Sequence, residues 1–246
     1  MLTLSVIIPT KNEERYLPRL LEALKQQTYT PLQIIVADAK STDRTRELAE
    51  QSGCLVVDGG LPGPGRNAGA KAATGDLLFF IDADAIIEDR EFFAKAIAEF
   101  TERNFDIATA DIYLEQGSKF EHAAHRFYNW YVRWWGSRHP HAPGFCILMR
   151  RRVFEAIHGF DETVLLAEDH DLVGRAGKIG AFGILNNVKM GASERRLRRD
   201  GWFKLLPTYI FGELHMLSLG PIRHNFFRYD FGYDSQGKAP VKPGQK

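Results

Sequence analysis

The chain has 246 residues, of which 44% are hydrophobic and 26% are charged, a composition typical of a globular protein with one large domain. Its formal net charge of +1 gives no overall positive field, which argues against a protein that binds nucleic acid. The sequence contains no run of about 18 apolar residues, so no segment is expected to span a membrane.

The first third of the sequence alternates short apolar runs with amphipathic segments. The apolar runs predict buried strands at 4–9, 32–38, 54–58 and 76–84. Leucines at helical spacing predict a helix over 13–27, and capping residues introduce a second helix over 41–51. A segment rich in Gly and Pro, 59–75, is expected to be a loop that runs into a short alanine-rich helix. This alternation predicts a parallel sheet covered by helices on both faces.

The rest of the sequence is less regular but continues to alternate. Helical patterns occupy 88–103, 120–135, 151–160 and 168–180. Strand-like segments occupy 105–114, 145–150 and 181–187. Basic and aromatic residues follow the last strand, and the closing segment 235–246 is polar with Pro and Gly, so we expect it to be disordered.

Two acidic residues stand two apart just past a strongly apolar run, in the segment FFIDADAII at 79–87. Like charges at close range repel, so Asp82 and Asp84 imply a cation between them or next to them. Ligands of parallel α/β sheets lie beyond the carboxyl ends of the strands. This rule places four polar segments around one crevice: 9–13, 38–43, 58–66 and 82–84.

Four sequence blocks occur in a fixed order between residues 5 and 173. They are SVIIPTKNEERYLPRLLEAL, IIVADAKSTDRT, GPGRNAGAKAATGDLLFFIDADAII and GFDETVLLAEDHDL. Together they resemble the family 2 glycosyltransferases, which are inverting enzymes with an Asp-x-Asp motif. The resemblance implies the GT-A fold, a Rossmann-like, mostly parallel central sheet flanked by helices, here followed by a basic, aromatic helical appendage.

The resemblance implies a pocket for a nucleotide diphosphate sugar. The residues that match the family's pocket are Pro9, Thr10, Lys11, Glu13, Asp38, Arg66, Asp82 and Ala83. Asp38 would accept a hydrogen bond from the base, usually uracil, whereas Asp43 is explained as a helix cap. Glu13 either contacts the nucleotide or favours a helix N-terminus. Arg66 either pairs with the base or diphosphate, or is a surface residue at a helix start.

Carboxylates also suggest the metal site and the base. A divalent cation stabilises a departing diphosphate, and Mn²⁺ or Mg²⁺ prefers one or two carboxylates together with the phosphates. By resemblance Asp84 binds the metal, and Asp82 holds the metal's waters or the ribose. Asp169, supported by Glu168, is the expected general base that deprotonates the acceptor hydroxyl. The alternative is that these acids merely complement a helix dipole.

Features of the acceptor side are less specific. Basic residues cluster at Arg195, Arg196, Arg198, Arg199 and Lys204, next to an apolar stretch. With the aromatic segment 125–144, they favour contact with an anionic membrane, although a solvated helix or an arginine on the diphosphate is also consistent. His139 and His141 either complete a metal shell or are plain surface residues. The acceptor would be a carbohydrate or a lipid-linked group; a soluble acceptor, a nucleotidyltransferase and an inactive nucleotide-sugar-binding module are the alternatives.

These predictions divide the chain and place it in the cell. We assign 1–190 to the GT-A catalytic domain, with a nucleotide-sugar-binding half at 1–114 and an acceptor half at 115–190. An amphipathic appendage follows at 191–234, before the disordered tail. Cys54 and Cys146 lack metal or disulfide spacing, and the N-terminus lacks the basic start of a signal peptide. We therefore expect a cytoplasmic protein, peripheral on the cytoplasmic face of the membrane.

Overall fold

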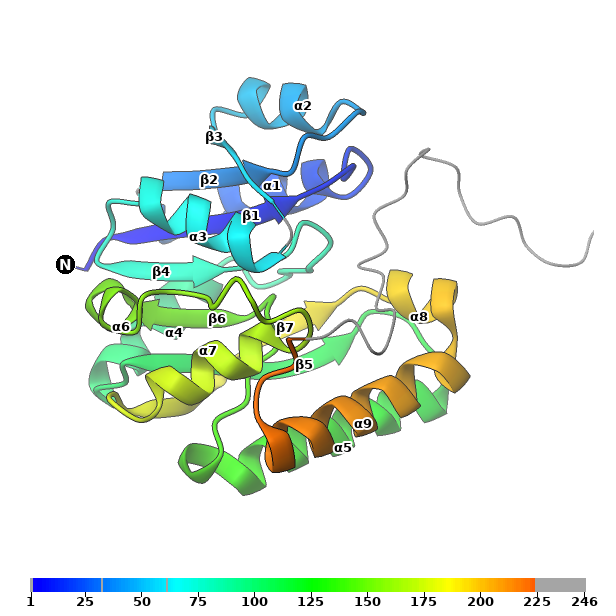
Figure 1. Ribbon diagram of the computed structural model, residues 1–246. Coiled ribbons are helices and arrows are strands. Elements are labelled where there is room, and N and C mark those ends of the chain that lie inside the picture. Colours follow the sequence, from blue (N-terminus) through cyan, green and yellow to red (C-terminus); the bar gives the residue numbers. More distant parts are fainter. Residues whose placement is uncertain (1, 32, 61, 224–246) are drawn as a thin grey trace, which may run out of the picture.

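The computed structural model describes residues 2–31, 33–60 and 62–223. A seven-stranded sheet in the order β3-β2-β1-β4-β6-β5-β7 forms its centre (Figure 1). The strands are β1 (Leu4–Thr10), β2 (Gln33–Asp38), β3 (Leu55–Asp58), β4 (Leu77–Phe80), β5 (Ile107–Leu114), β6 (Ile147–Arg150) and β7 (Phe182–Ala192). The helices are α1 (Leu17–Lys25), α2 (Thr45–Gln51), α3 (Pro62–Ala72), α4 (Phe92–Glu102), α5 (Lys119–Trp135), α6 (Arg151–Ala156), α7 (Glu168–Ala176), α8 (Arg195–Asp200) and α9 (Trp202–Leu219).

The sheet is mostly parallel, as predicted. β1 pairs in parallel with β2 and β4, β2 with β3, and β5 with β7. β6 is the exception, because it runs antiparallel to both β4 and β5. The carboxyl ends of β1, β2 and β4 therefore meet at one edge, and the loop that leads into β6 arrives at the same edge.

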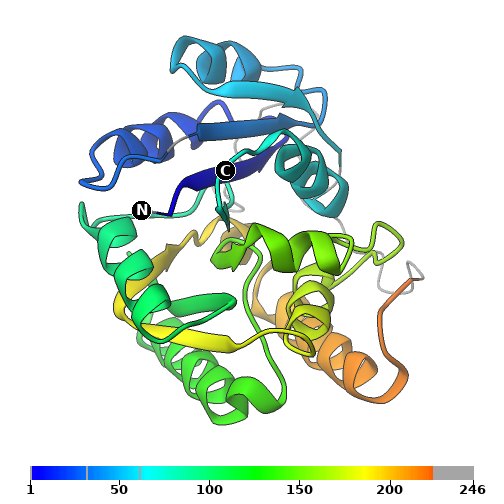
Figure 2. The same ribbon diagram turned by 90° about the vertical axis from the view of Figure 1, so that its left-hand side faces the viewer.

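Helices cover both faces of the sheet (Figure 2), which explains why the central strands β1 and β4 are fully buried and mainly apolar. Leu4, Val6 and Ile8 of β1 face the apolar side chains of α1 and α4. Ile7 and Phe80 face the opposite layer, which includes α6 and α7. A strand buried on both faces has no polar alternate positions, so its sequence is continuously hydrophobic.

Two boundaries differ from the sequence prediction in ways that shape the site. The Gly/Pro segment is helical from Pro62 on, whereas a loop was predicted there; proline is tolerated in the first turn of a helix because its missing N–H has no partner there. Gly69 lets this helix lie directly on the sheet, since a Cβ at Gly69 would stand 2.5 Å from Ile7 Cγ2. β4 ends at Phe80, so Asp82 and Asp84 lie in the turn after the strand and not within it.

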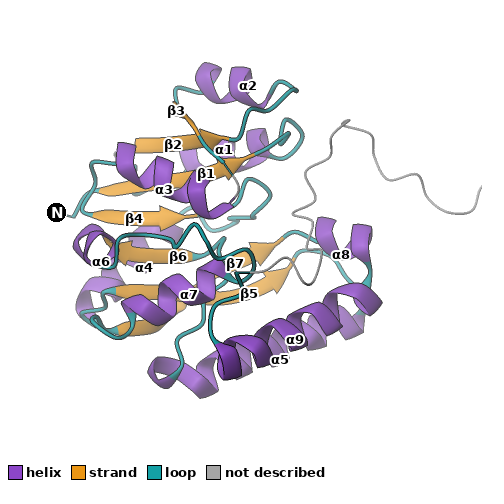
Figure 3. Ribbon diagram, in the orientation of Figure 1, coloured by secondary structure: helices purple, strands orange, loops and turns teal. Residues whose placement is uncertain are grey.

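The helices α5 and α9 lie side by side at one end of the molecule (Figures 1 and 3). Tyr131 of α5 donates a hydrogen bond of 2.8 Å to Glu213 of α9. β7 runs to Ala192, so the expected domain boundary at residue 190 falls inside a strand. The predicted tail 235–246 and the end of the predicted appendage lie outside the described residues. Among the helices of the described ranges, none combines the length and the hydropathy that a membrane crossing requires.

Candidate active site

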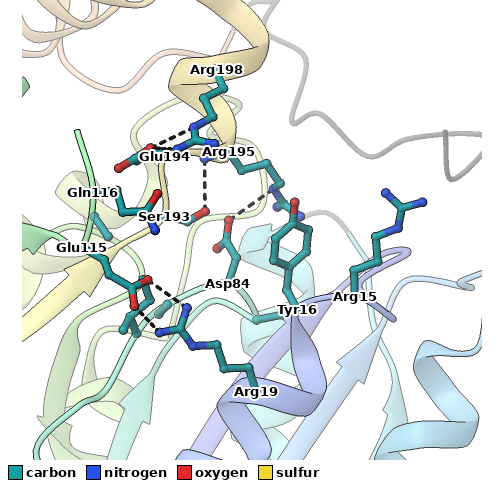
Figure 4. Close-up of a pocket in the computed structure, with 14 residues that line it drawn as sticks. Arg15, Tyr16, Arg19, Asp84, Glu115, Gln116, Ser193, Glu194, Arg195 and Arg198 are labelled. Carbon is teal, nitrogen blue, oxygen red and sulfur yellow. Dashed lines mark hydrogen bonds and ion pairs between the residues drawn. The ribbon is translucent and has the colours of Figure 1, made fainter. Parts of the chain in front are cut away.

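Each acid of the Asp-x-Asp segment pairs with an arginine from another part of the chain. Arg66 of α3 places Nη2 2.8 Å from Asp82 Oδ1. Arg195, at the start of α8, places Nε 3.2 Å from Asp84 Oδ2 (Figure 4). The cations that the sequence led us to expect beside these acids are therefore two guanidinium groups in this structure.

Arg66 joins the acids beyond β4 to those at the start of α7. Its side chain is 3% exposed, and Nη1 lies 2.8 Å from Glu168 Oε1. The guanidinium also fits closely under Gly144, where a Cβ would stand 2.7 Å from Nη2. The alternative that Arg66 is a surface residue is therefore wrong, because the side chain is buried in an ionic bridge from Asp82 to Glu168.

Arg195 also binds Glu13, which follows β1. Its Nη1 and Nη2 lie 2.6 and 2.9 Å from the two carboxylate oxygens of Glu13, in a bidentate pair. Burial raises the pKa of Glu13 to about 7 despite this contact, and burial also raises the pKa of Asp84. The side chain of Glu13 thus faces the acidic pair, which favours a role in the site over a role at the helix N-terminus.

The expected base-binding residues gather at the ends of β1 and β2. Asp38 is 1% exposed and accepts hydrogen bonds from Ser41 N at 3.0 Å and from Thr10 Oγ1 at 3.3 Å. Lys11 Nζ donates to the carbonyl oxygens of Ala39, at 2.8 Å, and Lys40, so this ammonium spans the ends of two strands. A buried carboxylate supported in this way presents a fixed acceptor.

The remaining predicted residues are placed as follows. Pro9 lies in β1 against Gly65 of α3. Ala83 is 3% exposed and lies between the two acids, at the wall of the pocket in Figure 4. Asp43 accepts hydrogen bonds from Thr45 N and Oγ1 at the start of α2, as expected of a capping residue.

Glu168 and Asp169 begin α7, close to the loop before β6. Asp169 Oδ2 accepts a hydrogen bond of 2.7 Å from the backbone N–H of Gly144. Burial and the neighbouring Asp169 raise the pKa of Glu168. Asp171 instead pairs with Arg175 within the helix at 2.7 Å. The start of α7 thus carries two acids whose side chains have different partners.

Together the predicted acids fit a divalent cation chemically. Four carboxylates, those of Glu13, Asp82, Asp84 and Glu168, pair with two guanidinium groups, and Asp169 adjoins Glu168. The raised pKa values of Glu13 and Asp84 also favour a bound cation, because these buried carboxyl groups have too little positive charge nearby to favour ionisation. Carboxylate oxygens are the ligands that Mg²⁺ and Mn²⁺ prefer, so a cation fits beside Asp84 if Arg195 turns aside.

The sequence grouped Arg195 in a basic cluster, with an arginine on the diphosphate as one alternative, and gave no sign of two neighbours, Tyr16 and Ser193. Tyr16 lies under the guanidinium, whose carbon is 4.7 Å from the ring centroid. Ser193 hydrogen-bonds to Asp84 and precedes Arg195 just after β7. The useful signal was position, because Arg195 follows the carboxyl end of a strand as the acids do.

Comparison with known proteins identifies the fold and the family. The model of a family described as glycosyl transferase family 2 matches residues 5–158. The poly(ribitol-phosphate) beta-N-acetylglucosaminyltransferase TarS of Staphylococcus aureus is 33% identical over 117 residues, 44% of this chain and 20% of that protein. The uncharacterized glycosyltransferase EpsJ of Bacillus subtilis is 28% identical over 206 residues, 76% of this chain and 58% of that protein. The chain thus spans 20% and 58% of the length of these two relatives.

Solved structures with the same fold include complexes with nucleotide sugars. The mannosyltransferase PcManGT from Pyrobaculum calidifontis, in complex with GDP-Man and Mn²⁺, has a TM-score of 0.65 at 20% identity over 85% of this chain and 64% of that chain. S. aureus TarS 1-349, in complex with UDP-GlcNAc, has a TM-score of 0.61 at 22% identity over 78% of this chain and 59% of that chain. These likenesses confirm the GT-A architecture predicted from the sequence.

Proposed function

Because this chain belongs to glycosyl transferase family 2, we propose that it transfers one sugar from a UDP-linked donor to an acceptor hydroxyl or lipid phosphate, with inversion at the anomeric carbon. The observation that carries the proposal is the bridge from Asp82 through Arg66 to Glu168. It ties the acids that would face the diphosphate to the helix that would carry the base. A transferase needs the diphosphate-facing acids and the general base in one crevice, whereas a protein that only binds nucleotide sugars needs no base.

The donor's base would lie against Asp38 and Thr10, and its ribose against Asp82. UDP is the favoured nucleotide because Asp38 is a buried acceptor suited to the N–H of uracil. S. aureus TarS 1-349 has been solved with UDP, whereas PcManGT has been solved with GDP-Man. GDP is therefore the competitor that the experiment must include.

A divalent ion, Mn²⁺ or Mg²⁺, would be held by Asp84, with Asp82 nearby. When bound, it would neutralise negative charge on the departing diphosphate. Arg195 has a related task in this proposal. In the free protein it neutralises Asp84 and Glu13, and with the donor present its planar guanidinium would turn to a phosphate, a geometry in which arginine is effective.

Asp169 is the proposed general base. Its carboxylate is oriented by the N–H of Gly144 and lies beside Glu168, whose own charge is balanced by Arg66. Asp169 would remove the proton from the acceptor oxygen as that oxygen forms the new glycosidic bond. The bond from the anomeric carbon to the diphosphate breaks on the opposite side, and this order of events inverts the configuration.

We also propose that the acceptor lies at a membrane surface, which α5 and α9 would contact. Large apolar side chains are exposed along both helices. They are Phe120, Phe127, Trp130 and Trp134 on α5, and Leu206, Tyr209, Ile210, Phe211, Leu214, Leu217 and Leu219 on α9. Below, these residues are called the α5–α9 surface. Exposed apolar patches of this extent mark interaction sites, and Trp and Tyr favour the lipid interface.

Arginines at the border of the α5–α9 surface favour an anionic bilayer over a protein partner. Arg126 is exposed on α5, next to the aromatic residues. Arg133 is exposed there too, but its guanidinium pairs with Asp111 at 2.9 Å. The basic cluster contributes less than expected, because Arg195 faces the acids and Arg198 pairs with Glu194 at α8. The structure does not describe the side chains of Arg196 and Lys204.

The transfer proposal is tested with donors and metal. The protein is incubated with UDP-sugars and GDP-sugars, with Mn²⁺ or with EDTA, in the presence of membrane lipid extract. We expect nucleotide release from a UDP-sugar that requires metal, requires the extract, and is lost in Asp169→Asn. Release from a GDP-sugar alone would overturn the base assignment. Equal release by Asp169→Asn would remove Asp169 as the base.

The membrane proposal is tested by sedimentation with vesicles. Wild-type protein should sediment with phosphatidylglycerol vesicles and much less with phosphatidylcholine vesicles. Trp130→Ser combined with Trp134→Ser should reduce sedimentation. Leu55→Ser should not, because Leu55 is 44% exposed but lies on β3, at the opposite edge of the sheet from β5 and β7. If wild type and double variant sediment equally, the enzyme acts on a soluble acceptor or meets the membrane elsewhere.

A further inference from the structure

Three histidines converge on Glu213, where α9 packs against the loop that leads into β6. His141 Nε2 lies 2.7 Å from Glu213 Oε1, and His139 Nε2 lies 3.8 Å from the same oxygen. His170 Nδ1 of α7 lies 3.6 Å from Glu213 Oε2. The proposed transfer reaction uses none of these four side chains, so their convergence needs another explanation.

The tautomer of His141 implies a positive charge between its Nε2 and the carboxylate of Glu213. Its Nδ1 lies 2.6 Å from the carbonyl oxygen of His139. A carbonyl oxygen can only accept, so Nδ1 carries the proton, and in the neutral ring Nε2 carries a lone pair. That lone pair would face the carboxylate oxygen of Glu213, and two acceptors at 2.7 Å repel. Either a second proton or a metal ion must stand between them.

Several features favour a metal ion over a second proton. His141 is 2% exposed, where a charged imidazolium loses its hydration. An Nδ1–H donated to a backbone carbonyl is the arrangement that orients metal-binding histidines. The ligand atoms of His139, His141 and Glu213 lie within 4.8 Å of one another. The edge of a tetrahedral zinc site is about 3.4 Å, so small side-chain rotations would close this set around an ion.

We propose that His139, His141 and Glu213 bind a zinc-class divalent cation, with His170 positioning the Glu213 carboxylate through its other oxygen. Two imidazole nitrogens and one carboxylate oxygen suit zinc, whereas Mg²⁺ and Mn²⁺ prefer oxygen donors alone. The site is separate from the Asp-x-Asp acids, because its ligands come from the loop before β6 and from α9. It also stands independently of the proposed transfer reaction.

Such a site would fix α9 to the domain that carries the acids. Glu213 lies on α9, and His170 follows the proposed base Asp169 directly. Tyr131 of α5 also donates to Glu213, so the ion would hold α5, α7 and α9 at one point. The predicted role is structural: it sets the α5–α9 surface in a fixed position relative to the crevice.

The test uses metal alone, on full-length protein without an affinity tag. The protein is stripped with EDTA, desalted and titrated with Co²⁺, whose visible absorption bands report tetrahedral nitrogen and oxygen ligands. We expect one equivalent to bind without nucleotide and Zn²⁺ to displace it, with a rise in melting temperature. Asp84→Asn should leave this binding unchanged, which separates it from the proposed nucleotide site.

Variants assign the ligands. His139→Ala is the most informative, because that side chain is 36% exposed and its loss is tolerated by folding more easily than loss of His141. His139→Ala and Glu213→Gln should each weaken Co²⁺ binding at least tenfold, while His122→Ala on α5 serves as the matched control. Absence of the cobalt bands in wild-type protein, or equal binding by all variants, would overturn the proposal in favour of a protonated histidine network.

Discussion

Arg66→Met removes the guanidinium that links Asp82 to Glu168 and keeps an unbranched side chain in α3. Both ion pairs are 2.8 Å long, and Arg66 is 3% exposed. Removing one partner of a buried ion pair costs about 3–5 kcal/mol, because the other charge stays buried without compensation. The side chain of Asp82 is 38% exposed and regains some hydration, so we expect a loss of about 3 kcal/mol in the free energy of unfolding at about pH 8.

The same variant has a predictable pH dependence. Burial already raises the pKa of Glu168 above its ordinary value of 4.5, and Arg66 opposes that rise. Without Arg66 the folded-state pKa rises further. A carboxyl group with a raised pKa binds its proton more tightly in the folded state than in the unfolded state, so stability falls as pH rises from the unfolded pKa through the folded one. The deficit relative to wild type should therefore be smaller at about pH 5 than at about pH 8.

Urea unfolding followed by tryptophan fluorescence measures both effects. Arg44→Met is the matched control, because its pair with Glu47 is 3.0 Å long but both side chains are exposed, at 63% and 51%. An exposed pair contributes about 0–1 kcal/mol. Adding Glu168→Gln to Arg66→Met should restore part of the stability. If Arg66→Met costs no more than Arg44→Met at either pH, the buried bridge is not the organising contact of the site.

The remaining predictions concern single side chains. Asp169→Asn should leave donor affinity unchanged in calorimetry and lower kcat by about 10²- to 10⁴-fold, the usual size of a general-base contribution; near-normal turnover would rule out this role. Arg195→Gln should weaken UDP binding about 10- to 100-fold, since a charge-assisted hydrogen bond contributes about 1.5–3 kcal/mol. Unchanged affinity would mean that Arg195 neutralises acids in the free protein and does not contact the nucleotide. Glu13 has a pKa raised to about 7, so wild type should lose stability as pH rises from about 4.5 to about 7 and Glu13→Gln should lack that loss; parallel pH curves would contradict the burial argument.

Local sequence patterns were sufficient to predict the strands and to place the acids at one edge of the sheet. Continuous apolar runs predicted buried strands, and the rule for parallel sheets brought Asp38 and Asp82 to the same edge. The first turns of α3 were missed, because their Gly/Pro sequence is typical of a loop and only the alanine-rich part was predicted to be helical. Its helical form depends on packing against β1, where Gly69 allows the close approach to Ile7.

The partners of the acids could not be predicted from local patterns. Glu13 and Arg195 are 182 residues apart, and Arg66 and Glu168 are 102 residues apart. Sequence spacing carries no information about such contacts until the topology is known. For the same reason Arg195 was grouped with its basic neighbours along the chain, and the histidines of the β6 loop were not connected with Glu213 on α9.

Thermal stability shows whether the acidic crevice binds a metal and a nucleoside diphosphate together. Melting temperatures are measured with UDP, GDP, ADP and CDP, each with Mn²⁺ and with EDTA, for wild type and Asp84→Asn. Ligands that bind the folded state raise the melting temperature by mass action. We expect a rise with UDP that requires Mn²⁺ and is absent in Asp84→Asn. A rise with UDP that persists in EDTA, or no rise with any nucleotide, would contradict this expectation.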